Sequence, residues 1–180
     1  FVQTIKGPTS GANANKVIVP AGQTLDASAG GFTTPAGHVI QVVQGTTSTM
    51  VQNTTQGTYA DTGLTASITP ASTSSKILVV VNQHCTIDRD EYYANMLFRI
   101  LRDSTAIETW GGDSPHLESG GATVVKLHAV MSYSYLDSPS STSSIAYKTQ
   151  VAPQITSNNG RVRTQQNSRP SYITLMEIAG

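Results

Sequence analysis

The sequence has little charge, a single cysteine and no long apolar run. Only 12% of its residues are charged, against about a quarter in a typical soluble domain. Its 11 Lys and Arg balance its 11 Asp and Glu, so no excess positive charge attracts a phosphate backbone or an anionic membrane surface. We therefore expect no nucleic-acid partner.

The scarcity of cysteine and of long apolar stretches narrows the protein class further. Cys85 is alone, which excludes an intrachain disulfide framework. The longest apolar stretch, Ile77–Val81, suits a buried strand and is too short to span a bilayer, so we expect no membrane insertion. The chain starts at Phe1 without Met and without a visible secretory signal, so we read it as a fragment. Durability outside a cell would then depend on packing and oligomerisation.

The residues that are abundant indicate a β protein. Ser and Thr together number 44 and supply much of the polar surface. From His38 onward, apolar residues alternate with polar ones between Ser, Gly and Pro turns at intervals of about ten residues, which is typical of an antiparallel β-sandwich or jelly roll. Strands are predicted around Val39–Val51, either continuous or broken near Gly45, and around Leu64–Thr69, Ser75–Thr86, Met96–Arg102, Ile107, Thr123–Leu136, Ile145–Val151 and Ile173–Ile178.

One segment allows a helix as well as a strand. In Asp88–Leu101, Asp88 could cap a helix with Glu91 at the capping-box spacing, yet the aromatic and branched residues fit a strand equally. The acidic cluster Asp88–Glu91 lacks the rest of a calcium-binding loop, and Arg89 in its middle opposes a divalent cation. We read it as a solvated turn with local ion pairs rather than a metal site or a catalytic carboxylate pair.

Signals for catalysis or metal binding are weak. The four histidines, His38, His84, His116 and His128, share no short ligand spacing, so zinc is poorly supported. His84 and His128 fall within predicted strands, where a residue that points from one face of the sheet is the simpler interpretation. No Gly-x-Ser-x-Gly elbow is present. We expect no catalytic residue, no cofactor and no bound metal.

Residues 1–37 differ from the rest and are predicted to form an extended segment ahead of a head domain at 38–180. The short apolar stretch at Val17, Ile18 and Val19, and Leu25 after it, cannot form an independent sheet. These residues must lie against the head domain or against neighbouring copies of the chain.

Several aromatic residues do not fit the alternating apolar positions that point into the core of the predicted strands. Tyr92 and Tyr93 are adjacent, so one of them points away from the core of a strand, and Trp110 lies in a segment that reads as a loop near Asp113 and His116. An exposed ring beside polar groups is typical of a sugar-binding edge. Alternatively, Trp110 closes the end of the sandwich or packs at a subunit interface.

An ordered set of segments resembles the carboxy-terminal domain of bacteriophage tail-fibre proteins, especially those of aquatic phages and cyanophages. The segments are Gly37–Gln44, Asp61–Pro70, Ser74–Val79, Arg102–Ile107, Tyr135–Pro139 and Ile173–Ile178, and Val17–Asp26 resembles the shaft-side sequence before such domains.

The resemblance implies a virion protein that forms a homotrimer, with Val17, Ile18, Val19 and Leu25 as trimer contacts. It also implies binding of host-surface glycans through variable loops, which places the recognition surface in Asp88–Asn95 and Thr109–Gly121. The receptor-binding residues predicted there are Tyr92, Tyr93, Trp110, Asp113 and His116. The alternatives are a capsid-decoration or tail-assembly protein that binds other virion proteins, and a polysaccharide depolymerase.

Overall fold

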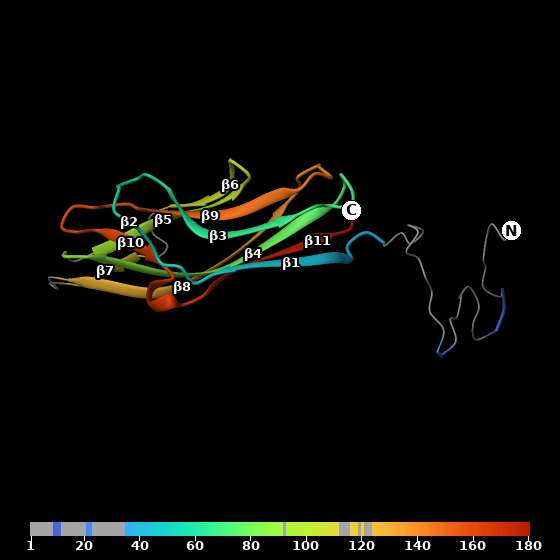
Figure 1. The fold of residues 1–180 in the computed structure, drawn as a ribbon, viewed down its shortest axis with the longest axis horizontal. Coiled ribbons are helices and arrows are strands. Elements are labelled where there is room, and N and C mark those ends of the chain that lie inside the picture. The colour runs from blue at the N-terminus through green and yellow to red at the C-terminus, as the bar shows by residue number, and fades with distance from the viewer. Residues whose placement is uncertain are drawn as a thin grey trace. The chain divides into compact units, whose positions relative to one another are not determined.

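The alternating pattern forms two antiparallel sheets in the computed structural model of the protein (Figure 1). The structure describes residues 9–11, 21–22, 35–91, 93–111, 116–118, 120 and 124–180. Contacts divide the chain into two compact units, Phe1–Thr33 and Thr34–Gly180, and both sheets belong to the second unit.

Sheet A is built around one long strand, β4, which carries the most apolar stretch of the sequence. One edge of β4 pairs first with β11 and then with β10, while its other edge pairs along its whole length with β8. Outward from β4, β11 pairs with β1 and β10 pairs with β2. The strands of sheet A are β1 (Val39–Thr47), β2 (Val51–Asn53), β4 (Lys76–Arg89), β8 (Val125–Asp137), β10 (Arg161–Thr164) and β11 (Ser171–Ile178).

The strands of sheet B follow the order β3-β9-β5-β6. The short β7 pairs with the first residues of β5, Tyr93 to Asn95, whereas β6 pairs with the later residues, Phe98 to Arg102. Figure 1 shows β3, β9 and β6 in one layer and β1, β11 and β8 in the other. A short turn of 3-10 helix, η1 (Gln166–Ser168), precedes β11. The strands of sheet B are β3 (Ala60–Ile68), β5 (Tyr93–Arg102), β6 (Thr105–Trp110), β7 (His116–Glu118) and β9 (Ile145–Pro153).

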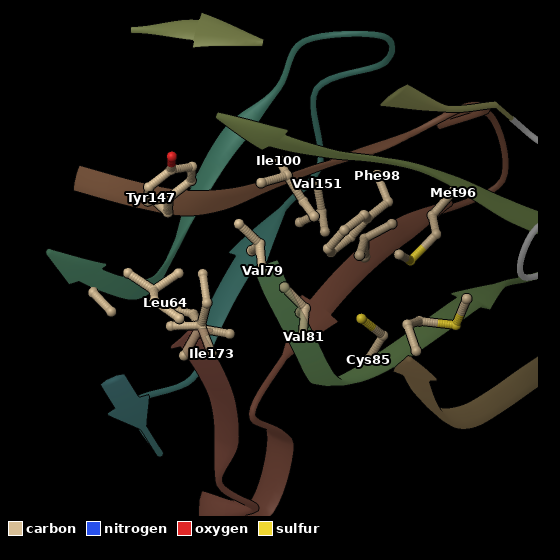
Figure 2. Packing of buried hydrophobic residues seen from close by; sticks show 14 of the residues in the cluster. Leu64, Val79, Val81, Cys85, Met96, Phe98, Ile100, Tyr147, Val151 and Ile173 are labelled. Carbon is tan, nitrogen blue, oxygen red and sulfur yellow. The ribbon is translucent and has the colours of Figure 1, made fainter. Parts of the chain in front are cut away.

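The core fills the space between the two sheets. Val79 and Val81 of β4 and Ile173 of β11 face Phe98 and other apolar side chains of sheet B, as Figure 2 shows. Each of these four side chains is fully buried. Buried residues alternate with more exposed ones along much of the strands, as on β3, and this arrangement confirms the antiparallel β-sandwich predicted from the sequence.

A series of hydrogen bonds between buried polar side chains also crosses the core. Thr62 on β3 hydrogen-bonds Thr149 on β9, and the Thr149 hydroxyl donates to the side-chain oxygen of Gln83 on β4. The Gln83 amide in turn donates to the hydroxyl of Ser171 on β11 at 2.9 Å. All four residues are fully buried. Buried polar groups that are satisfied in this way favour one register of the sheets over others.

The predicted strands agree with the structure at most positions. The Met96–Ile107 hairpin is present as β5 and β6, joined by a turn in which Asp103 has a left-handed φ of 52°. The helical alternative for Asp88–Leu101 is wrong, because this segment is the end of β4 and most of β5. The chain continues as strand through Gly45, and the first strand ends at Thr47.

The interpretation of Asp88–Glu91 as a solvated turn is wrong for its first half. Asp88 and Arg89 are buried at the end of β4. The Asp88 carboxylate accepts a hydrogen bond from Arg161 Nε at 2.8 Å and another from Arg163, both on β10. Local sequence could not reveal these partners, because β10 lies more than 70 residues further along the chain.

Candidate functional site

The predicted receptor-binding residues that the structure describes lie along one edge of β5. Tyr93 begins β5, His116 begins β7 and Trp110 ends β6. Tyr92 and Asp113 lie outside the described residues, as do the predicted trimer contacts Val17, Ile18, Val19 and Leu25.

Trp110 belongs to a strand rather than to the expected loop. Its ring packs inward against the core, with its centroid 4.0 Å from that of Tyr133 on β8 and 5.7 Å from that of Phe98 on β5. Phe98 and Tyr133 also stack on each other, at 4.8 Å. This aromatic cluster joins sheet A to sheet B at one side of the sandwich. Trp110 thus packs within the sandwich, which is closer to the alternative that it closes the end of the sandwich than to an exposed sugar-binding ring. Its stacked ring is poorly placed to receive a sugar.

Tyr93 and His116 do lie together. Their ring centroids are 6.1 Å apart, and the guanidinium carbon of Arg89 lies 4.8 Å from the centroid of the Tyr93 ring. The His116 ring is also 3.8 Å from Glu118 on the same short strand. Tyr93 and His116 therefore form a small polar and aromatic group at one end of sheet B, apart from the inward-facing Trp110.

Most carboxylates of the described residues are held by neighbouring groups. Asp137 binds Arg102 and the hydroxyl of Tyr147, and burial together with this hydrogen bond raises the pKa of Tyr147. Burial also acts to raise the pKa of Glu177, but hydrogen bonds from Ser75, Gln41 and the Ala71 amide outweigh it and leave that pKa lowered. Asp61 and Asp88 are held by side chains of neighbouring strands, and Asp90, Glu91 and Asp103 each accept a hydrogen bond from a residue far along the chain. Glu108 accepts a hydrogen bond from the amide of Thr109 next to it, and Glu118 is 69% exposed, 3.8 Å from His116.

The outer face of sheet B is polar. Lys148 and Gln150 on β9 both donate to Asp61, and Arg99 on β5 donates to Gln150 at 2.7 Å. The Arg99 guanidinium also lies over the ring of Tyr59, 3.9 Å from its centroid. Such a connected network of charged and amide groups is suited to contact with water.

The outer face of sheet A is different, because one end of it is apolar. Strand register aligns Val42 of β1 with Met176 of β11, Met176 with Leu78 of β4, and Leu78 with Leu136 of β8. We call these four residues the apolar row. Val42 is 57% exposed and Leu136 is 51% exposed. The next row, Gln44, Thr174, Val80 and Ser134, carries no formal charge.

The opposite end of the same face holds a hollow lined by polar side chains. His84 and Thr86 come from β4, His128 from β8, and Gln166 and Arg169 from η1 and the residue that caps it. Thr86 Oγ1 and His128 Nδ1 are 2.9 Å apart, which fixes the orientation of the His128 ring. The remaining lining residues are Cys85, Ala129 and Val130. We call this site the polar hollow.

The sequence placed His84 and His128 on strands but gave no reason to bring them together. The one sequence signal is that each histidine occupies a polar position in a strand whose apolar and polar residues alternate. In the structure β4 and β8 pair so that Thr86 lies opposite His128 and His84 lies opposite Val130, which puts both histidines on the same face. Within the described part of the chain, no group of three or more His, Cys, Asp or Glu residues could hold a metal ion. No helix among the described residues is long and apolar enough to cross a membrane.

Comparison with known proteins identifies no family for the chain. No protein-family model matches it, and no curated protein matches it. Two solved structures of infectious bursal disease virus share low sequence identity and weak structural similarity with this chain. The structure of the Gx strain has 12% sequence identity and a TM-score of 0.42, and the structure of the D431N mutant VP2 protein in T=1 particles has 13% sequence identity and a TM-score of 0.41. These alignments cover 90% and 96% of this chain but only 37% and 44% of the viral chains.

Proposed function

We propose that this chain is the non-catalytic head domain of a homotrimeric phage tail fibre that binds a host-surface polysaccharide. The resemblance in the sequence supplies the tail-fibre context. The buried carboxylates support a role without catalysis, because Asp88, Asp137 and Glu177 are engaged in holding strands and turns together. A glycosidase needs a pair of carboxyl groups that face a bound sugar.

The observation that carries the assembly part of the proposal is the apolar row on the outer face of sheet A. Exposed apolar side chains that gather in one patch mark a surface for association. The apolar row and the row beside it that contains Val80 carry no formal charge, and Lys76 lies in the row on the other side. Two copies can therefore meet over the two uncharged rows without like-charge repulsion. The outer face of sheet B, with its network around Asp61, is the face suited to remain in water.

Mass measurement in solution tests the assembly. The full chain is expected to show three times its own mass of 19.0 kDa. A double variant, Val42→Ser and Leu136→Ser, removes two exposed apolar side chains from the row and should raise the dissociation constant of the assembly more than tenfold, since burying one such side chain contributes roughly 1.5–3 kcal/mol. Ser67→Ala, an exposed position on β3, is the control and should leave the constant unchanged. A wild-type monomer at all concentrations would contradict the fibre assignment.

Two further experiments separate the remaining functions. Electron microscopy of labelled particles should place the protein at a tail-fibre tip; a position on the capsid surface would instead favour a decoration protein. Incubation with host capsule or lipopolysaccharide should leave the polymer length unchanged, and shortening of the polymer would show a depolymerase.

A further inference from the structure

The polar hollow on the outer face of sheet A is rich in hydrogen-bond donors. Arg169 offers five N–H groups and a permanent positive charge, and the side-chain amide of Gln166 adds two further donors. Because His128 Nδ1 is engaged with Thr86, the Nε2 atom of that ring is left for a ligand. The lining residues include no carboxylate.

The charge around the polar hollow favours an anion. Beside it, Arg161 and Arg163 of β10 and Lys126 of β8 share the outer face with Asp88, which is opposite Arg161 on one side and opposite Lys126 on the other. Together with Arg169, this end of the face carries four cations and one carboxylate, that of Asp88, which the two β10 arginines already hold. A ligand with a negative charge therefore meets a positive field here.

The turn that forms one wall of the polar hollow is held in an unusual backbone conformation. Gln165, Asn167 and Ser168 all have left-handed φ angles, between 50° and 59°, although none of them is glycine. Residues in this region cost free energy and cluster at ligand sites, where surrounding structure holds them. Gln166, between them, has a buried side-chain oxygen with no hydrogen-bond partner among the described residues.

The mixture of groups points to a hydroxylated ligand rather than a simple anion. A carboxylate alone would use Arg169 and leave the imidazoles of His84 and His128 and the amide of Gln166 without a role. A sugar ring that carries a carboxylate matches the set, because its hydroxyl groups can both donate to and accept from these side chains. Val130, which is 51% exposed on the same face, supplies a small apolar surface for the ring.

We propose that the polar hollow binds an acidic sugar residue, with the carboxylate on Arg169 and the hydroxyl groups on His84, His128 and Gln166. This inference rests on the proposed host-glycan function and names the sugar class. It also moves the recognition surface from the loops around Trp110 to the outer face of sheet A.

Titration of the full, isotope-labelled chain by NMR tests the site, with D-glucuronate, D-glucose and acetate as probes. Glucuronate should shift the backbone amides of His84, Thr86, His128 and Gln166, and it should bind at least tenfold more tightly than glucose or acetate. Arg169→Gln should weaken glucuronate binding about tenfold, which is the effect of losing one charge-assisted contact. His128→Gln should weaken it as well. Lys76→Gln removes the same charge from the opposite end of β4 and should leave binding unchanged.

Each other outcome overturns a stated part of the inference. Equal binding of glucose would remove the acid preference, and equal binding of acetate would show an anion site without sugar recognition. Wild-type affinity in Arg169→Gln would place the ligand elsewhere. A whole-cell binding assay keeps the two proposals apart: cells bound without any response to glucuronate would reject the polar hollow alone, whereas a response to glucuronate without binding of host cells would reject the proposed host function.

Discussion

At the scale of single residues, Glu177 shows how a buried charge is stabilised by donors. Its side chain is fully buried near the end of β11. The carboxylate accepts hydrogen bonds from Gln41 Nε2 at 2.6 Å, from Ser75 Oγ at 2.6 Å and from the Ala71 amide at 2.7 Å. A buried carboxylate is costly without such partners. With them, it ties β1, the turn before β4 and β11 into one unit.

The lowered pKa of Glu177 gives a prediction for acid stability. Because the pKa is lower in the folded chain than the ordinary 4.5, the stabilisation is complete above pH 4.5 and is lost as the pH falls through the folded value. Urea unfolding at descending pH should therefore show a flatter acid dependence for Glu177→Gln than for the wild type. At neutral pH the variant should be about 1–3 kcal/mol less stable. The exposed Glu118→Gln should match the wild type, and identical acid slopes for all three proteins would refute the assignment.

At the scale of the elements, Asp137 joins the two sheets where β8 ends. Arg102 of β5 donates to both oxygens of its carboxylate, at 2.9 and 3.0 Å, and the hydroxyl of Tyr147 on β9 donates at 2.7 Å. Asp137 and Tyr147 are buried, and the Arg102 side chain is 30% exposed. One residue of sheet A thus binds two strands of sheet B.

Removal of this link should be costly. Asp137→Ala leaves the Tyr147 hydroxyl and part of the Arg102 guanidinium buried without an acceptor, so we expect a loss of about 3 kcal/mol in the free energy of unfolding. Asp90→Ala, at an exposed carboxylate bound only to Asn159 among the described residues, should change stability by less than about 0.5 kcal/mol. Equilibrium denaturation of both variants measures the difference, and equal stabilities would show that Asp137 is not a link between the sheets.

Gly45 marks a close approach between β1 and β3. A Cβ atom added there would collide with the carbonyl oxygen of Thr65, which is backbone and cannot rotate away. Gly45→Ala should destabilise the fold by roughly 1–3 kcal/mol, as overpacking does. In Gly111→Ala the new atom meets nothing within 4 Å, so thermal unfolding of this control should stay near that of the wild type. A Gly45→Ala protein as stable as the wild type would mean that the sheets can separate locally at no cost.

At the scale of the whole molecule, the end of the chain is essential to sheet A. β11 lies between β1 and β4 and pairs with both of them. It also carries Ile173 and Leu175, which are fully buried. Within the described part of the chain, β1 is therefore hydrogen-bonded to sheet A only through β11, so this sheet cannot be completed before β11 is available.

Deletion of residues 171–180 tests this dependence. The shortened chain should lose cooperative thermal unfolding and near-ultraviolet circular dichroism, since β1 loses its hydrogen-bond partner and the core loses two large side chains. Deletion of residues 1–8 is the comparison and should preserve both signals. Survival of a cooperative transition without β11 would mean that β1 and β4 can pair directly.

Prediction from the sequence was most successful where a pattern is local. Alternation in Leu64–Thr69, in Thr123–Leu136 and in Ile173–Ile178 indicated β3, β8 and β11 correctly. The sequence does not indicate β7 or β10, and it joins the start of β2 to β1 in the stretch Val39–Val51, because three or four residues carry too little pattern to mark a separate strand. The Gly and Pro residues after Trp110 indicate a loop in the sequence, but Trp110 itself is the last residue of β6, so the prediction that it lies in a loop is wrong.

The sequence by itself determined that the chain is an antiparallel β protein, because the period of its apolar residues and its turn residues are local properties. Only the tertiary structure decided which distant side chains meet: Asp88 with two arginines of β10, Trp110 with Tyr133, and His84 and His128 with Arg169. It also decided that one outer face is polar and the other partly apolar. The reason is physical, since pairing between strands far apart in the chain sets which side chains share a face, and alternation alone leaves that pairing open.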